Sequence, residues 1–271
     1  MADLASARSD IRPWPGTPVV TLRDVSKTFA NGVIALDRLD IDVRPGEFLS
    51  LLGPSGCGKS TALRLIAGLS APSRGSIAWA QGLDSRPTPR AIGFVFQEPT
   101  LMPWASVFGN VHLPLRLAGI GEDKAASQVM ETLARVGLAD FANVYPRELS
   151  GGMKMRVSIA RALVTQPGLL LMDEPFAALD EITRFKLNGD LLALWQSLGK
   201  TIVFVTHSVF ESVFLSNRIV IMTPRPGRVF AELAIHAPYP RDQSFRTSAD
   251  YAALCRLASD ALARAMEGSA A

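Results

Sequence analysis

The octet Gly53-Pro-Ser-Gly-Cys-Gly-Lys-Ser60 decides the fold of this 271-residue chain. It fits the pattern G-x-x-x-x-G-K-[ST], in which glycines permit a loop whose backbone N–H groups wrap a chain of phosphates. The apolar run 47–52 before it indicates a buried strand, and residues 59–67 after it have helical spacing that ends at Gly68. This succession predicts a phosphate-binding loop at the N-terminus of a helix.

Acidic side chains follow another apolar run, residues 169–172. Asp173 would then stand at the carboxyl end of a parallel strand, where ligands of open α/β sheets bind. Beside a phosphate-binding loop, Asp173 could bind Mg²⁺ through a water molecule, and Glu174 could polarise the water that attacks the phosphate. Lys59 can reach the β and γ phosphates, and the Ser60 hydroxyl can hold Mg²⁺. Alone, the Asp-Glu pair would indicate a solvated acidic turn.

Two further polar residues end apolar strands. His207 closes the run 201–205, so we expect it at the same sheet edge, where a neutral imidazole could contact the γ phosphate or the water. A lone histidine is more often structural or merely exposed. Gln97 follows the run 92–96, and its amide could coordinate Mg²⁺ or hold a water. By spacing alone, it is an ordinary polar strand terminus.

A second candidate anion site is Leu149-Ser-Gly-Gly-Met153, which precedes a helix. Ser150 is a plausible N-cap, and the two glycines would expose N–H groups. The alternative is simply a capped helix, and general physics does not separate the two. A phosphate bound here would lie in a different subdomain from the first loop and could belong to a second molecule's nucleotide.

The rest of the chain alternates strands and helices, which predicts an α/β fold with a mostly parallel sheet covered on both faces. The other expected strands are 18–29 with an irregular exit, 75–79, 91–96, 168–172, 201–205 and 218–222, and a helix is expected at 181–198. Residues from Pro99 to about Val164 are expected to form an inserted helical subdomain. It would begin with a linker punctuated by Pro99, Pro103 and Pro114 and contain a helix up to Gly137. After Pro238 a short amphipathic helix is expected, with Tyr251, Leu254, Ala258 and Ala261 on one face.

Composition excludes several classes of protein. The formal charge is only +3, from 28 Lys and Arg against 25 Asp and Glu, which disfavours a dedicated nucleic-acid binder. Cys57 and Cys255 form neither a disulfide framework nor a metal cluster, so we expect a reducing cytoplasm. The apolar runs are too short for a membrane-spanning helix, and residues 1–18 lack the apolar core of a signal peptide. They are expected to form a flexible tail.

Together these motifs resemble the ATP-binding subunits of ABC transporters, from about Val19 to about Glu232. Residues 53–60 resemble the Walker A motif, 149–153 the signature motif and 169–173 the Walker B motif. The other matches are Gln97 to the Q-loop, Glu174 to the catalytic base, Ala178-Leu-Asp180 to the D-loop, His207 to the switch histidine, and Phe29 to the aromatic residue that stacks on adenine. Met153 replaces the usual glutamine and Phe29 the commoner tyrosine, but the stack needs only a ring.

The resemblance implies a P-loop NTPase core with an N-terminal antiparallel β-subdomain, an inserted helical subdomain and, after residue 236, a C-terminal helical extension. It implies that two copies close around two molecules of ATP with Mg²⁺. The residues implied for ATP are Phe29, Gly53, Pro54, Ser55, Gly56, Cys57, Gly58, Lys59, Ser60, Thr61 and Asp180, with Ser150, Gly151 and Gly152 of the other copy. Those implied for the metal are Ser60, Gln97 and Asp173, and those for catalysis are Glu174, His207, Lys59 and Gln97.

The segments 97–104, 171–184 and 222–228 resemble in particular the nitrate/sulfonate/taurine importer group. Its ATPases work with a separate membrane permease and a solute-binding protein, which implies a peripheral location on the cytoplasmic face of the inner membrane. Residues 99–108 would then contact the permease. The alternatives are an exporter ATPase, a soluble non-transport ATPase and a small-molecule kinase. The kinase would leave the signature motif and Asp180 without a role.

Overall fold

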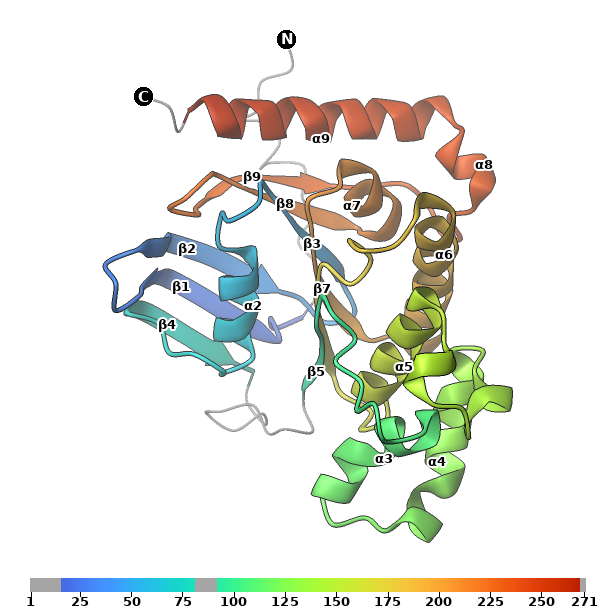
Figure 1. The fold of residues 1–271 in the computed structure, drawn as a ribbon. Helices are drawn as coiled ribbons and strands as arrows, with labels where there is room; N and C mark the ends of the chain where they lie inside the picture. The colour runs from blue at the N-terminus through green and yellow to red at the C-terminus, as the bar shows by residue number, and fades with distance from the viewer. Residues whose placement is uncertain (1–15, 81–91, 269–271) are drawn as a thin grey trace. The chain divides into compact units, whose positions relative to one another are not determined.

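The computed structural model describes residues 16–80 and 92–268 (Figure 1). The chain forms two compact units, which we call the core unit, Met1–Pro87 with Thr201–Ala271, and the inserted unit, Thr88–Lys200. Most of the expected N-terminal tail lies outside the described residues, as do the last three residues of the C-terminal extension. Among the described residues, no helix combines the length and the apolar character needed to cross a membrane.

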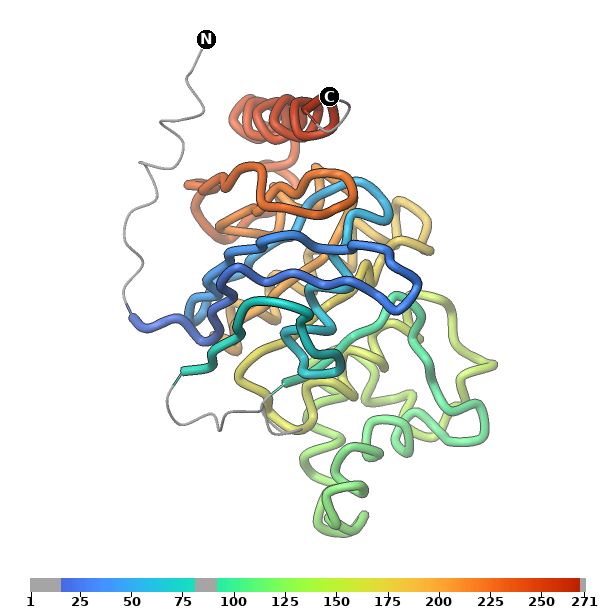
Figure 2. Tube along the Cα trace, turned by 90° about the vertical axis from the view of Figure 1, so that its left-hand side faces the viewer, coloured from blue at the N-terminus to red at the C-terminus, as the bar shows by residue number. Residues whose placement is uncertain are grey.

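A three-stranded antiparallel sheet opens the core unit. Its order is β2 (Ile34–Val43), β1 (Val20–Thr28) and β4 (Arg74–Trp79), and its strands lie side by side in Figure 2. The sequence predicted β1 and β4 but not β2. Asp24 and Arg38 both have φ near 49°, and the register between β1 and β2 shifts after Leu22. These irregularities interrupt the alternation of apolar and polar residues that marks a half-buried strand.

The second sheet of the core unit holds the strand that enters the phosphate-binding loop. The order within this unit is β7 (Thr201–Thr206), β3 (Phe48–Leu52), β8 (Arg218–Met222) and β9 (Val229–Ala234). The first three are parallel to one another and wholly buried, which confirms the predictions made from their apolar runs. Antiparallel β9 was not predicted: buried positions alternate along its second half, but Glu232 is the only polar residue in the strand, so its sequence does not alternate.

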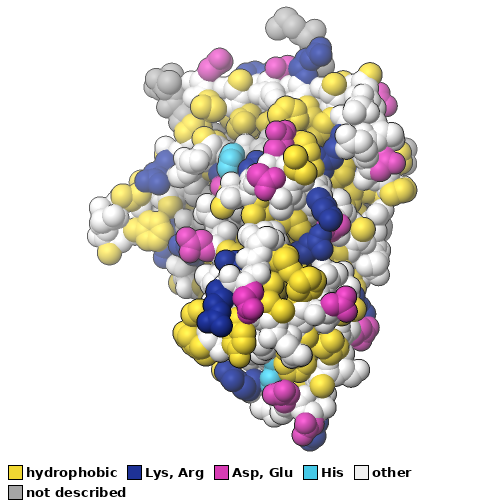
Figure 3. Space-filling view, turned by 45° about the vertical axis from the view of Figure 1, so that its right-hand side comes forward, with side chains coloured by type: hydrophobic (Ala, Val, Ile, Leu, Met, Phe, Trp, Pro, Cys, Tyr) yellow, Lys and Arg dark blue, Asp and Glu magenta, His cyan; other side chains and the backbone are white. Residues whose placement is uncertain are grey.

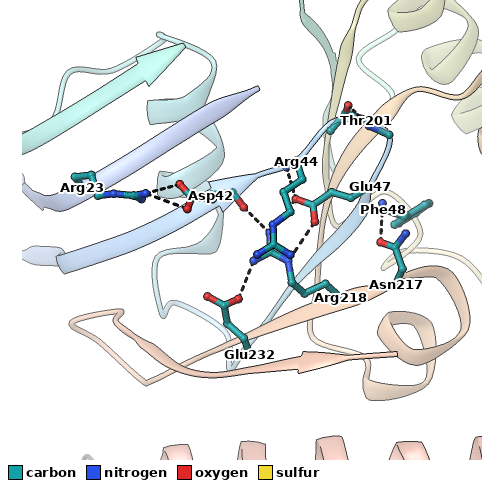
Figure 4. Close-up of polar contacts among 10 residues, drawn as sticks. Arg23, Asp42, Arg44, Glu47, Phe48, Thr201, Asn217, Arg218 and Glu232 are labelled. Carbon is teal, nitrogen blue, oxygen red and sulfur yellow. Dashed lines mark hydrogen bonds and ion pairs between the residues drawn. The ribbon is translucent and has the colours of Figure 1, made fainter. Parts of the chain in front are cut away.

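A buried arginine ties the two sheets of the core unit together (Figure 4). Arg218 of β8 donates to both carboxylate oxygens of Glu47, at 2.8 and 3.1 Å, and to Glu232 of β9 at 2.7 Å. It also donates to the backbone carbonyl of Asp42 in β2. Burial alone lowers the pKa of Arg218, but the two carboxylates raise it above its ordinary value. Burial raises the pKa of Glu47, against the lowering effect of Arg218. Removing either partner of such a buried pair would cost about 3–5 kcal/mol.

Four helices complete the described core unit. They are α2 (Lys59–Ile66), α7 (Val209–Leu215), α8 (Gln243–Arg246) and α9 (Ala249–Glu267). The helix expected after Pro238 is longer than predicted, since α9 has 19 residues, and it lies along the β8–β9 hairpin and against α7 (Figures 1 and 2). Its buried face carries Tyr251, Cys255, Ala258, Ala261 and Ala265, and Leu254 is only half-buried.

The inserted unit pairs β5 (Ile92–Val95) in parallel with β6 (Leu169–Asp173) and adds four α-helices. These are α3 (Val107–Leu117), α4 (Glu122–Arg135), α5 (Gly151–Leu163) and α6 (Glu181–Leu198). The expected linker was wrong at Pro114, which lies inside α3. Ser106 caps that helix by accepting from the N–H of Gly109, and Pro114 stands only three residues before its end. Pro114 has no N–H to donate to the carbonyl of Asn110, so α3 forms with one backbone hydrogen bond fewer.

Candidate functional site

Glycines shape the loop between β3 and α2. Gly56 and Gly58 have φ of 76° and 102°, values that favour glycine. A β-carbon on Gly53 would lie 2.8 Å from the Cys57 sulfur, and one on Gly58 would lie 2.7 Å from the carbonyl oxygen of Ala35. The backbone of this octet is therefore closely enclosed, and larger residues do not fit at these two positions.

Lys59 begins α2 and turns back across the loop. It is 3% exposed, and its ammonium group donates to the carbonyl oxygens of Gly53, at 2.8 Å, and Pro54, at 3.0 Å. Ser60 and Thr61 stand in the same first turn, half-buried. Unsatisfied N–H groups at a helix N-terminus and a nearby ammonium group favour an anion, so this loop fits a phosphate chain.

Segment 222–228, whose sequence resembles the importer group, packs against this loop. It forms the turn between β8 and β9 and places Gly227 against the loop backbone. The N–H of Gly227 donates to the carbonyl of Ala35 at 3.0 Å. In the same turn, Nε of Arg225 donates to the carbonyl of Gly56 at 3.1 Å. Arg225 is separated by 169 positions from its partner, and no local pattern in the sequence pointed to this contact.

The core unit also holds Phe29 and His207. Phe29 follows β1 and is 42% exposed, so one face of its ring can take a stacked base; the Lys27 ammonium lies 5.7 Å from the ring centre. His207 follows β7 directly and is exposed. Both positions agree with the strand ends expected from the sequence. The sheet edge that His207 and Asp173 were expected to share stays a prediction, because these two residues belong to different units.

The acidic pair of the inserted unit lies at the end of β6. Asp173 is the last residue of the strand and is 7% exposed. Glu174 follows with φ of 45°, a left-handed conformation that costs a non-glycine residue about 1–3 kcal/mol. Such strain recurs where a side chain must be aimed at a ligand. The geometry therefore gives the two adjacent acids different environments, one buried at the strand end and one on a strained turn.

Gln97 is exposed after β5, and the chain beyond it is held by α5. Arg161 of α5 donates to the carbonyls of Pro99, at 2.7 Å, and Thr100, at 2.9 Å. Thr100 has φ of 46°, a left-handed conformation. Because Arg161 lies on the helix that Ser150 caps, one rigid helix connects the segment after Gln97 with the signature motif.

The signature motif packs beside the D-loop in the same unit. Ser150 caps α5 by accepting from the N–H of Met153 at 3.3 Å, which confirms the predicted N-cap. A β-carbon on Gly152 would lie 2.8 Å from Thr183, and one on Gly151 would lie 3.2 Å from Leu179. Asp180 caps α6, and its hydrogen bond from the Thr183 N–H lowers the pKa of its carboxyl.

Oxygen donors suited to Mg²⁺ occur in both units. They are the hydroxyl of Ser60, the amide of Gln97 and the carboxylate of Asp173, which are hard ligands of the kind that this ion takes alongside phosphate oxygens. On the face drawn in Figure 3, Lys and Arg side chains are interspersed with Asp and Glu. At the loop itself, the Lys59 ammonium and the N-terminus of α2 supply positive charge for a phosphate.

Comparison with known proteins adds independent findings. Residues 36–177 match the family described as ABC transporter. The chain is 46% identical over 206 residues to the taurine import ATP-binding protein TauB of Rhizobium johnstonii, covering 75% of this chain and 77% of that protein. It is 43% identical over 225 residues to the aliphatic sulfonates import ATP-binding protein SsuB of Bacillus subtilis, covering 81% of this chain and 83% of that protein.

Solved structures agree with these sequence matches. The dimeric, post-hydrolysis structure of the ATP-binding cassette MJ0796 bound to ADP and Pi superposes with a TM-score of 0.70 and 34% identity. The superposition covers 81% of this chain and 100% of that one. The fold expected from the motifs, a nucleotide-binding α/β core with an antiparallel β-subdomain, is therefore confirmed.

Proposed function

Because this chain belongs to the ABC transporter family as an ATP-hydrolysing, ATP-binding subunit, we propose that it powers an importer for nitrate, a sulfonate, taurine or a similar small solute. The observation that carries the proposal is the enclosed glycine loop around the Lys59 ammonium at the start of α2. Two relatives named as taurine and aliphatic sulfonate import proteins support the choice of solute class.

We propose that the loop binds the phosphates of ATP. Backbone N–H groups of residues 53–61 would surround the phosphate chain, and Lys59 would exchange its carbonyl partners for phosphate oxygens. The exposed ring of Phe29 would stack on the adenine. The enclosed backbone and the turn behind it hold the N–H groups in place before the nucleotide arrives, which lowers the entropic cost of binding.

The roles proposed for hydrolysis rest on the resemblance to the family. Glu174 would orient the water that attacks the γ phosphate, and His207 and Gln97 would contact the phosphate or that water. Ser60, Gln97 and Asp173 would hold Mg²⁺, which supplies charge neutralisation at the phosphate oxygens. Catalysis would thus come from positioning and electrostatic stabilisation, without a covalent intermediate.

A second copy would complete each site. In this proposal, Ser150, Gly151 and Gly152 of one copy contact the nucleotide held by the loop of the other, so hydrolysis requires dimerisation. Asp180 also takes part in nucleotide binding. The capped N-terminus of α5, where Gly151 packs against Leu179 of the D-loop, would offer its N–H groups to a phosphate. The dimeric cassette with which the chain superposes supports this arrangement.

The remaining partners would be an integral-membrane permease and a solute-binding protein, and the chain would act at the cytoplasmic face of the inner membrane without entering it. The permease contact is proposed for residues 99–108, where Trp104 is 77% exposed and Val107 is buried. Loss of the γ phosphate, sensed by Gln97, would reach this segment through the hydrogen bonds of Arg161.

Replacing the proposed catalytic base tests the enzyme and the transporter separately. Purified Glu174→Gln should bind ATP, barely hydrolyse it and accumulate as an ATP-bound dimer; an active monomer would contradict the role of Glu174. Cells carrying Glu174→Gln in place of the native chain should lose uptake of one labelled solute among nitrate, alkanesulfonates, taurine and pyrimidine precursors. Glu267→Gln, at the exposed end of α9, is the matched control and should leave uptake unchanged. Unchanged uptake of every solute by Glu174→Gln would contradict the assignment to nitrate, sulfonate or taurine import and reopen export.

A further inference from the structure

The strand end that carries His207 is closed by hydrogen bonds to the first turn of α7. The Thr206 hydroxyl donates to Oε2 of Glu211 at 2.5 Å and accepts from the N–H of Ser208 at 3.0 Å. The Ser208 hydroxyl in turn accepts from the N–H of Glu211 at 3.3 Å, so it caps the helix. Thr206 and Glu211 are 2% and 8% exposed. The backbone on both sides of the exposed His207 is therefore fixed by buried groups of α7.

The other end of α7 is held by the C-terminal extension. Arg241 is 4% exposed, and its Nη1 donates to the carbonyls of Val213, Phe214 and Ser216 at 2.8–3.0 Å. The Tyr239 hydroxyl donates to the carbonyl of Leu215 at 3.1 Å. The last carbonyls of a helix have no partner within the helix, and here the extension supplies one.

Two further contacts reach the residues next to the two ends of α7. The Tyr251 hydroxyl of α9 donates to the carbonyl of Phe210 at 2.9 Å. The Arg246 guanidinium of α8 lies 3.7 Å from the centre of the Phe214 ring, within cation–π range. The extension thus contacts α7 along most of its seven residues, by groups that are charged or hydrogen-bonded rather than by apolar packing alone.

We propose that residues 239–251 of the extension and Glu211 together position His207: the extension fixes α7, and Glu211 transmits that position to the histidine through Thr206. The inference rests on the proposed contact of His207 with the γ phosphate. Glu211 and Tyr251 are positioning residues in this proposal, since each acts on His207 through other groups: Glu211 through the Thr206 hydroxyl and Tyr251 through α7. A displacement of a contact by about 1 Å can cost up to 10²-fold in rate, so the effect should fall on kcat and spare ATP binding.

The test compares variants in the presence and absence of His207. Glu211→Ala and Tyr251→Phe should each lower the kcat of ATP hydrolysis about 5–10-fold with KM and ATP affinity within twofold of wild type. Glu211→Gln keeps an oxygen that accepts from Thr206 and should restore most of the rate. Arg256→Ala, on the exposed side of α9, is the control and should hydrolyse ATP at the wild-type rate.

Single-turnover rates in the His207→Ala background separate positioning from general damage. If Glu211 and Tyr251 act through His207, adding their substitutions to His207→Ala should cause no further loss. A further loss by the same factor, or unchanged kcat in the single variants, would overturn the inference. Failure of the proposed function looks different, because wild type would then not hydrolyse ATP or His207→Ala would hydrolyse it normally.

Discussion

Gly227 lies so close to the phosphate-binding loop that a β-carbon built on it would stand 2.0 Å from the carbonyl oxygen of Cys57. The β8–β9 turn and the loop are therefore in direct backbone contact, with Arg225 bonded to Gly56 beside it. Since no side chain can relieve a clash with a backbone carbonyl, the shape of the loop depends on a glycine found 170 positions later in the chain.

Substitution of this glycine should damage both stability and nucleotide binding. Gly227→Ala forces the turn away from the loop, and we expect a loss of about 1–3 kcal/mol in the free energy of unfolding and weaker ATP binding. Gly189→Ala, in α6, is the matched control, because nothing lies within 4 Å of a β-carbon at this position. It should raise the free energy of unfolding by about 0.5–1 kcal/mol. Urea unfolding and ATP titration measure both quantities; equal stability of the two variants would contradict the packing argument.

The Lys59 ammonium should account for a large part of the affinity for ATP. It donates to the carbonyl oxygens of Gly53 and Pro54, so it lies within the loop, and Lys59→Ala removes this positive charge from the loop. We expect at least a tenfold rise in Kd for ATP, since hydrogen bonds to charged groups are worth about 1.5–3 kcal/mol. Lys186→Ala, exposed on α6, should leave Kd unchanged. Retained affinity in Lys59→Ala, measured by calorimetry, would refute the predicted role of the loop.

Alkaline unfolding should report on the C-terminal extension. Burial raises the pKa of Tyr239 to about 12, against the lowering effect of Arg241. An unfolded tyrosine ionises near pH 10, so between pH 10 and 12 the unfolded chain loses a proton that the folded chain keeps, and stability falls. Each pH unit in this range lowers the free energy of unfolding by about 1.4 kcal/mol, so the whole range costs on the order of 3 kcal/mol. Tyr239→Phe should show a shallower decline in urea unfolding over this range; parallel declines would contradict the shift.

The sequence predicts the elements that are buried along their whole length or have clear end signals. Wholly buried β3, β7 and β8 are continuous apolar runs, and α6 has its predicted ends because Asp180 caps it and Gly199, at φ of 59°, ends it. Prediction failed where local irregularity hid the pattern, as at Arg38 in β2 and Pro114 in α3. It also failed for contacts between distant positions.

Arg225 and Arg241 illustrate that second failure. Arg225 bonds to a carbonyl 169 positions away, and Arg241 to carbonyls of α7 25 to 28 positions away. Backbone carbonyls carry no residue identity, so their arginine partners leave no mark in the sequence. The motif residues were found because their chemistry depends on side-chain type and short spacing, whereas these supporting contacts depend on the completed fold.

The loop before α3 should carry much of the affinity for a permease. Asn110 is fully buried; its amide donates to the carbonyls of Ala105 and Ser106 at 3.1 and 3.0 Å, and its oxygen accepts from the N–H of Met102 at 2.7 Å. The loop is thereby fixed around Trp104, which is 77% exposed. A large aromatic side chain presented on a fixed backbone is typical of residues that dominate binding energy at interfaces.

Trp104→Ala should therefore weaken binding to the permease in detergent or nanodiscs by about 30-fold, equivalent to about 2 kcal/mol, with unchanged ATP affinity and melting temperature. Leu117→Ala is the matched control: Leu117 ends α3 and is 79% exposed, and its substitution also removes an exposed apolar side chain. Binding is measured by titrating each variant into the reconstituted permease. An equal loss for both variants would indicate a nonspecific apolar contribution, and no loss for Trp104→Ala would place the permease contact elsewhere on the chain.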